Sequence, residues 1–140
     1  MIPLTPSDSL TTKNSHSNQA DWSPPELLLE VAADDDALLV KVIDVFGRDT
    51  DTRMAQMRRA LAASNYPNIC AEAHTIKGCA MQMGAEAVGE ACHQLEIACG
   101  LQEASLIAAR LNRVQELFDE IRGAMVAYSS SRGTKSSVTP

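Results

Sequence analysis

The segment PNICAEAHTIKGCAMQMG, residues 67–84, decides the fold that the sequence predicts. At about 100° per residue, one side of this segment collects apolar side chains. They are Ile69, Ala73, Ile76, Ala80 and Met83. The spacing predicts an amphipathic helix over about 67–83 whose apolar side lies in a core, with Gly84 as its C-cap.

The opposite side of this helix carries an unusual group of residues. His74 lies roughly 140° from the centre of the apolar side and is expected on the outer face. Lys77 follows one turn later, and Gly78 exposes bare backbone beside the histidine. Glycine inside a helix costs about 1 kcal/mol relative to alanine, so it needs a reason. Close helix packing and close approach of a partner are the two candidates, and the outward position of Gly78 favours the partner.

Further helices are expected on both sides of this segment. Residues with helical apolar spacing indicate a short helix that opens at 23–26, and longer ones at about 36–64, 85–99 and 103–128. Short connections between amphipathic helices favour antiparallel neighbours. The predicted fold is therefore all-α, an antiparallel up-and-down four-helix bundle with a short additional N-terminal helix.

Capping residues support these boundaries. Ser23 and Glu26 match a capping box around Pro24. The acidic run 34–36 offers caps and favourable charge for the next helix start. Gly100 is expected to stop the fourth helix.

The two ends of the chain have a different composition. Residues 1–21 and 129–140 are rich in Ser, Thr, Asn or Pro and have no apolar period, which predicts disordered tails. The bundle is expected to occupy 22–128 as one domain.

Charge and hydropathy exclude several classes of protein. A net charge of −6 argues against nucleic acid or an anionic membrane as the main partner. No stretch approaches the about 20 apolar residues of a membrane span, and no signal peptide is expected. The four cysteines contain no C-x-x-C pair, so free thiols in a reducing, cytoplasmic setting are expected.

The exposed histidine suits nucleophilic chemistry. Neutral imidazole is a nucleophile near pH 7, because its ordinary pKa is about 6.5. Lys77 could attract the oxygens of an incoming phosphoryl group and offset charge during its transfer. Bare backbone at Gly78 would leave room for that group.

Several stretches resemble the histidine-containing phosphotransfer (HPt) domain family. Residues 73–85 are similar to its signature, a histidine followed by x-[Leu/Ile/Phe]-Lys-Gly, small residues and a glycine ten positions after the histidine. The stretch CHQLE, residues 92–96, resembles the family's Cys-x-x-Leu-Glu or -Gln, and the resemblance covers about 22–128. Cys79 and Met83 depart from the usual Ser or Ala and Leu or Ile, with little change in size.

The resemblance implies a role for each matching residue. His74 matches the phosphoacceptor, Lys77 the charge-stabilising lysine and Gly78 the residue that opens access. Glu96 matches a Gln or Glu that hydrogen-bonds the histidine from the next helix. Cys70, Ala71 and Met81 lie on or beside the outer face and are expected to form an apolar docking rim.

The resemblance also implies a function. The protein is expected to be a monomeric phosphorelay intermediate in two-component signalling, without its own ATP-dependent kinase activity. It would accept a phosphoryl group from a receiver-domain aspartate and pass it to another. The partners would be receiver domains of response regulators and of a hybrid histidine kinase. No cofactor of its own is expected, since the receiver supplies the Mg²⁺.

Three alternatives belong to other classes. In a metal-binding bundle, Cys70 and His74 could share a face, but zinc needs about four ligands and the other thiols are not expected to converge. In a scaffolding bundle, His74 would be idle. A histidine kinase dimerisation domain would be accompanied by a nucleotide-binding domain and a Gly-rich loop, which the sequence lacks. His93 has no accompanying lysine and glycine.

Overall fold

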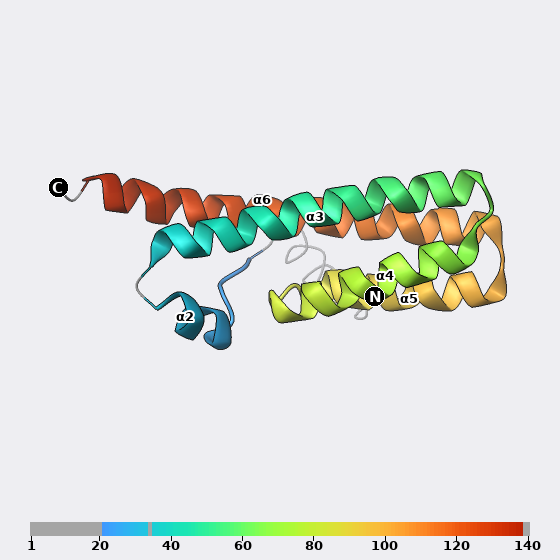
Figure 1. The fold of residues 1–140 in the computed structure, drawn as a ribbon, viewed down its shortest axis with the longest axis horizontal. Helices are drawn as coiled ribbons and strands as arrows, with labels where there is room; N and C mark the ends of the chain where they lie inside the picture. The colour runs from blue at the N-terminus through green and yellow to red at the C-terminus, as the bar shows by residue number, and fades with distance from the viewer. Residues whose placement is uncertain (1–20, 34, 139–140) are drawn as a thin grey trace, which may run out of the picture.

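Five helices make up the described part of the chain, which covers residues 21–33 and 35–138 of a computed structural model. They are α2 (Glu26–Ala32), α3 (Asp36–Ala62), α4 (Tyr66–Gln82), α5 (Glu86–Leu101) and α6 (Ala104–Val138). The helices α3 to α6 run alternately up and down, and α2 is a short additional helix that precedes α3 in the chain (Figure 1). The predicted all-α fold is confirmed.

The four long helices form a square in chain order. Each packs against two neighbours, α4 against α3 and α5, and α6 against α5 and α3. In Figure 1, α3 and α6 are longer than the hairpin of α4 and α5 and extend past its closed end, where the chain turns from α4 into α5. There α2 packs against α3. We call the line of contact between α4 and α5 the α4–α5 seam, and that between α3 and α6 the α3–α6 seam.

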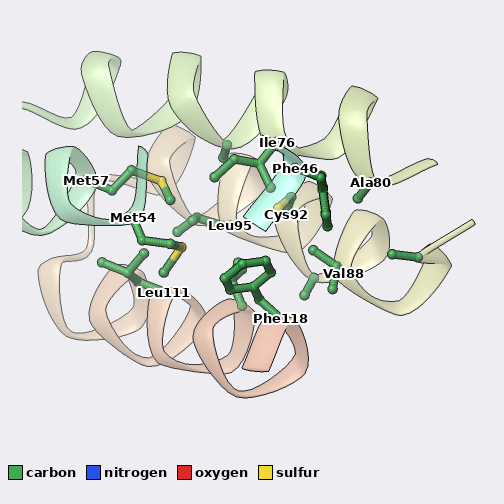
Figure 2. Packing of buried hydrophobic residues seen from close by; sticks show 14 of the residues in the cluster. Phe46, Met54, Met57, Ile76, Ala80, Val88, Cys92, Leu95, Leu111 and Phe118 are labelled. Carbon is green, nitrogen blue, oxygen red and sulfur yellow. The ribbon is translucent and has the colours of Figure 1, made fainter. Parts of the chain in front are cut away.

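The core lies between the four helices (Figure 2). Its largest fully buried side chains include Met57, Ile69, Ile76, Leu95, Ile107, Leu111 and Phe118. All five apolar residues predicted for the inner side of α4 are buried. Each large apolar side chain contributes about 1.5–3 kcal/mol on burial, so this stripe fixes the rotation of α4 about its axis.

Local contacts define the start of α3 and the end of α4. The Asp35 side chain accepts a hydrogen bond from the Leu38 backbone N–H at 3.0 Å, as the acidic run predicted. Gly84 follows α4 with a φ of +74°, a conformation that glycine adopts without strain. The Trp22 indole donates to the Met83 carbonyl at 2.7 Å, which anchors the N-terminal segment to this end of α4.

Three predicted boundaries are wrong. The capping box at Ser23 does not form, and α2 begins at Glu26 after Pro25, because a residue that precedes proline is disfavoured in the helical region. Gly100 does not stop α5, which ends at Leu101 with Gln102 in the left-handed region. The last helix continues past residue 128 to Val138, since no proline interrupts this stretch.

The predicted tails are only partly described. Residues 129–138 are helical where we expected a tail. Residues 1–20, 34 and 139–140, including most of the predicted N-terminal tail, lie outside the described residues. Within the described ranges, none of the helices has the length and apolar content that a membrane span requires.

Candidate functional site

His74 lies in the middle of α4 and points into solvent. Its side chain is 71% exposed, whereas the preceding residue, Ala73, is fully buried. The buried stripe thus fixes the helix, and the helix presents the imidazole outward, where the sequence predicted it. Solvent access on this scale allows a second protein to reach the ring.

Glu96 of α5 joins His74 to Lys77 across the α4–α5 seam. Its Oε1 lies 3.5 Å from His74 Nδ1, and its Oε2 lies 2.8 Å from Lys77 Nζ. The contact with the imidazole is longer than a strong hydrogen bond, but it favours a proton on Nδ1. In that tautomer the lone pair of Nε2 is left for chemistry.

The charge of Glu96 is stabilised by these two neighbours. Burial by itself raises the pKa of the Glu96 carboxyl. The hydrogen bond and charge of Lys77, followed by those of His74, outweigh burial, and the pKa is lowered from the ordinary 4.5. Glu96 is therefore ionised at neutral pH and holds the Lys77 ammonium beside the imidazole.

Gly78 faces open space beside His74. A Cβ built on Gly78 would have no heavy atom within 4 Å, apart from its own helix backbone and chain neighbours. Close helix packing therefore does not explain this glycine. The backbone it exposes clears one flank of the histidine for an approaching group.

Two grooves flank the contact between His74 and Glu96 in the α4–α5 seam. The first, of about 230 Å³, is lined by Cys70 and Cys99 among others. The second, of about 520 Å³, is lined by six residues, Lys77, Met81, Glu86, Gly89, Glu90 and His93. We call the second the Met81 groove.

The predicted apolar rim is divided between these two places. Cys70 is half-buried in the first groove, Ala71 is exposed, and Met81 is 52% exposed at the Met81 groove. The three residues therefore border the site on both sides of His74 along α4. The surface around the histidine therefore combines these apolar side chains with the charged side chains that line the Met81 groove.

Sequence reasoning missed the contribution of α5 to this surface. Glu86, Gly89, Glu90 and His93 form a row on α5 that leads toward Glu96. A signal was present, since Gly89 is a helix-interior glycine two turns before Glu96. His93, which lacks its own lysine and glycine in sequence, lines the same groove as Lys77.

The geometry gives little support to a metal site. Among the described residues, no three His, Cys, Asp or Glu side chains converge in a way that could hold an ion. Burial, followed by the charge of Glu96, raises the pKa of the Cys92 thiol to about 12 despite Lys77. Burial also raises the pKa of Cys99 to about 11. Burial thus disfavours the thiolate form of both groups in the metal-free protein.

Comparison with known proteins agrees with this geometry. The model of the Hpt domain family matches residues 41–124, which include all of α4 and α5. The chain is also similar to the crystal structure of histidine-containing phosphotransfer protein B (HptB) from Pseudomonas aeruginosa PAO1. That match has a TM-score of 0.67 and 22% identity, and it covers 77% of this chain and 95% of that chain. At this identity the likeness shows the fold.

No curated protein matches the chain. The family match spans more than half of its length and contains the histidine, lysine and glycine described above. Members of this family are phosphotransfer carriers in two-component signalling that interact with receiver domains, and they are not kinases. The chain therefore belongs to the histidine-containing phosphotransfer (Hpt) domain family.

Proposed function

We propose that this protein is a phosphorelay intermediate that accepts a phosphoryl group on His74 from the aspartate of one receiver domain and passes it to the aspartate of another. The observation that carries the proposal is the exposed His74 imidazole with Glu96 at Nδ1 and open space at Gly78. Together they give a nucleophile a defined orientation and an unobstructed approach.

The transfer can be written with these groups. The Nε2 lone pair attacks the phosphorus of an aspartyl phosphate, the bond from phosphorus to the aspartate oxygen breaks, and the aspartate leaves as a carboxylate. The phosphorylated ring keeps its Nδ1 proton and gains a positive charge, which the ionised Glu96 stabilises from 3.5 Å. The reverse sequence delivers the group to the second aspartate.

Lys77 would assist by its charge. Its Nζ is held 2.8 Å from Glu96 and one helical turn from His74, so it can turn toward the phosphoryl oxygens without leaving the site. The receiver would supply the Mg²⁺ ion that neutralises those oxygens on the aspartate side. The protein needs no nucleotide for this role, because the phosphoryl group arrives already activated.

The proposed partners are receiver domains of response regulators and of a hybrid histidine kinase. They would dock around His74 on the rim of Cys70, Ala71 and Met81. Because a relay must release each partner, the interface should be small and the complex short-lived. We propose that the protein acts as a monomer in the cytoplasm.

The test is incubation with receiver domains labelled on aspartate with radioactive phosphate, in the presence of Mg²⁺. Wild-type protein should take up acid-labile label, and His74→Gln should abolish uptake while the helical circular-dichroism spectrum is unchanged, since the site is exposed and Gln is a good helix former. His93→Gln is the matched control, because His93 is exposed in the adjacent groove.

The two variants separate the possible outcomes. Label retained in His74→Gln and lost in His93→Gln would move the acceptor to His93. Label retained at the normal rate in both variants would refute a histidine acceptor in this seam. The absence of uptake by wild-type protein from every receiver tested would refute the proposed relay function.

A further inference from the structure

The Met81 groove continues the site along the α4–α5 seam. On α4, His74, Lys77 and Met81 follow one another at helical spacing on the outer face. On α5, the row that includes Glu90 and His93 leads to Glu96, which contacts His74. A protein that covers His74 from this side must therefore lie over the groove.

The floor of the groove is apolar and adjustable. A Cβ on Gly89 would lie 2.5 Å from Met81 Sδ, so the thioether rests on bare helix backbone of α5. Methionine is unbranched and flexible, and it adapts to apolar side chains of different shapes. Met81 can thus seat an apolar residue of a partner, or move aside for a larger one.

The rim of the groove is acidic. Glu86 and Glu90 are exposed, and neither has an ion-pair partner within the part of the chain that the structure describes. Glu90 accepts only a neutral hydrogen bond, from Gln94 Nε2 at 3.1 Å. The positive charge of Lys77 is matched by Glu96 at 2.8 Å, so Lys77 is not paired with either rim carboxylate. Glu90 also lines a groove with Arg110 and Arg113 but forms no ion pair with them.

We propose that the Met81 groove selects the receiver, by taking a surface helix that carries an apolar residue against Met81 and a Lys or Arg opposite Glu86 and Glu90. This inference rests on the proposed function, whose partner it describes chemically. A groove along two helices suits a third helix laid in it. Unpaired rim charges act on the association rate and on the rejection of wrong partners more than on final affinity.

The experiment removes the rim charges in pairs. The test variant is Glu86→Gln/Glu90→Gln, and the control that removes the same charge is Glu116→Gln/Glu120→Gln on α6, where Glu116 forms an exposed ion pair with Arg113. Both pairs are four residues apart and exposed, and both double variants change the net charge from −6 to −4. The control pair lines neither groove of the α4–α5 seam. Glutamine is a good helix former, so both variants should fold.

Second-order phosphotransfer rates are measured from an aspartyl-phosphorylated receiver domain that labels wild-type His74. At low ionic strength, the groove variant should be slower by about tenfold, and much of the salt dependence of the rate should be lost. The control variant should keep the wild-type rate and salt dependence. Phosphoramidate, a small phosphodonor, should label wild-type protein and both variants equally.

The outcomes distinguish this inference from the function on which it rests. Equal rates and salt dependence in the groove and control variants, with normal labelling of wild type, would overturn the selecting role alone. A groove variant that is equally slow with phosphoramidate would also overturn it, because the carboxylates would then act on His74 itself. Wild-type protein that no receiver labels would overturn both.

Discussion

Gly47 and Gly78 are both helix-interior glycines, but their surroundings are opposite. Gly47 of α3 is buried, and a Cβ there would lie 3.0 Å from the Arg122 guanidinium of α6. Arg122 binds Asp51 at 2.7 Å and lies 5.4 Å from the centre of the Phe118 ring. A Cβ on Gly78 of α4 would meet nothing within 4 Å.

The difference separates two uses of the same residue. At Gly47 the missing side chain lets an arginine close the α3–α6 seam, which is a packing role. At Gly78 the missing side chain leaves the helix backbone bare beside His74, and no part of the described chain fills the space. The helix pays the same propensity cost in both places. Open space by itself does not mark a site, because Gly123 of α6 also meets nothing within 4 Å, and what distinguishes Gly78 is its position beside His74.

The largest expected effect is a loss of phosphotransfer rate when a side chain is placed at Gly78. Gly78→Gln should slow phosphotransfer from a receiver by about a hundredfold, because a displaced partner cannot bring its aspartate to His74. The free energy of unfolding should stay equal or rise, since glycine is unfavourable in a helix. Stopped-flow transfer and urea unfolding measure the two quantities. Unchanged transfer kinetics would refute the access role of Gly78.

A smaller loss of phosphotransfer rate is expected when Met81, in the α4–α5 seam, is replaced. Met81→Lys should slow transfer from a receiver by about tenfold, because it places charge on an apolar and otherwise acidic docking surface. Phosphorylation of His74 by phosphoramidate should be nearly unchanged, since Glu96, and not Met81, is the residue that pairs with His74 and Lys77. Equal losses with both donors would mean that Met81 supports the fold or the ring directly.

Replacing Gly78 or Gly47 by alanine adds one methyl group, and the two substitutions should change the free energy of unfolding differently. Gly78→Ala should stabilise the fold by about 0.5–1 kcal/mol, the usual gain in a helix. Gly47→Ala should lose that gain, because Arg122 must shift from an ion pair and a cation–π contact worth together about 1 kcal/mol. Urea unfolding measures both free energies.

A double variant provides the control for this pair. In the Arg122→Ala background, Gly47→Ala should become stabilising, because the atoms that the new methyl group would meet are gone. If Gly47→Ala is as stabilising as Gly78→Ala with Arg122 intact, the packing role assigned to Gly47 is wrong.

The smallest expected effect is a pH dependence of the stability that Glu96 contributes in the α4–α5 seam. The pKa of Glu96 is lowered in the folded protein, so its contribution to stability is complete above the ordinary value of 4.5 and is lost as the pH falls through the lowered value. The difference in unfolding free energy between wild type and Glu96→Gln should therefore be constant at neutral pH and shrink below 4.5.

The exposed Glu120→Gln variant on α6 controls for the general titration of carboxylates. Urea unfolding at a series of pH values gives all three curves. A difference between wild type and Glu96→Gln that does not change below 4.5 would contradict the ion pair with Lys77 as the source of the shift.

Much of α4 was predictable because it depends on local geometry. The helical period alone separates the buried side from the side of His74, and burial of all five predicted core residues agrees with it. The positive φ of Gly84 and the Asp35 cap also follow from neighbouring residues. The start of α2 at Glu26 and the ends of α5 at Leu101 and α6 at Val138 were not predicted correctly. A helix end is set by small local preferences of about 1 kcal/mol that compete with one another.

The sequence by itself determined the fold class, the family and the outward position of His74, since each depends on residue types at short spacing within single helices and on the short connections between them. The resemblance named Glu96 as the partner of His74 from the next helix, and only the tertiary structure decided its distance, its second contact with Lys77 and what else the other helices bring. The contact of Glu96 with His74, the Met81 thioether over Gly89 and the Arg122 side chain over Gly47 all join separate helices. Such contacts depend on the register of one helix against another, which packing of the whole core fixes and which no local periodicity contains.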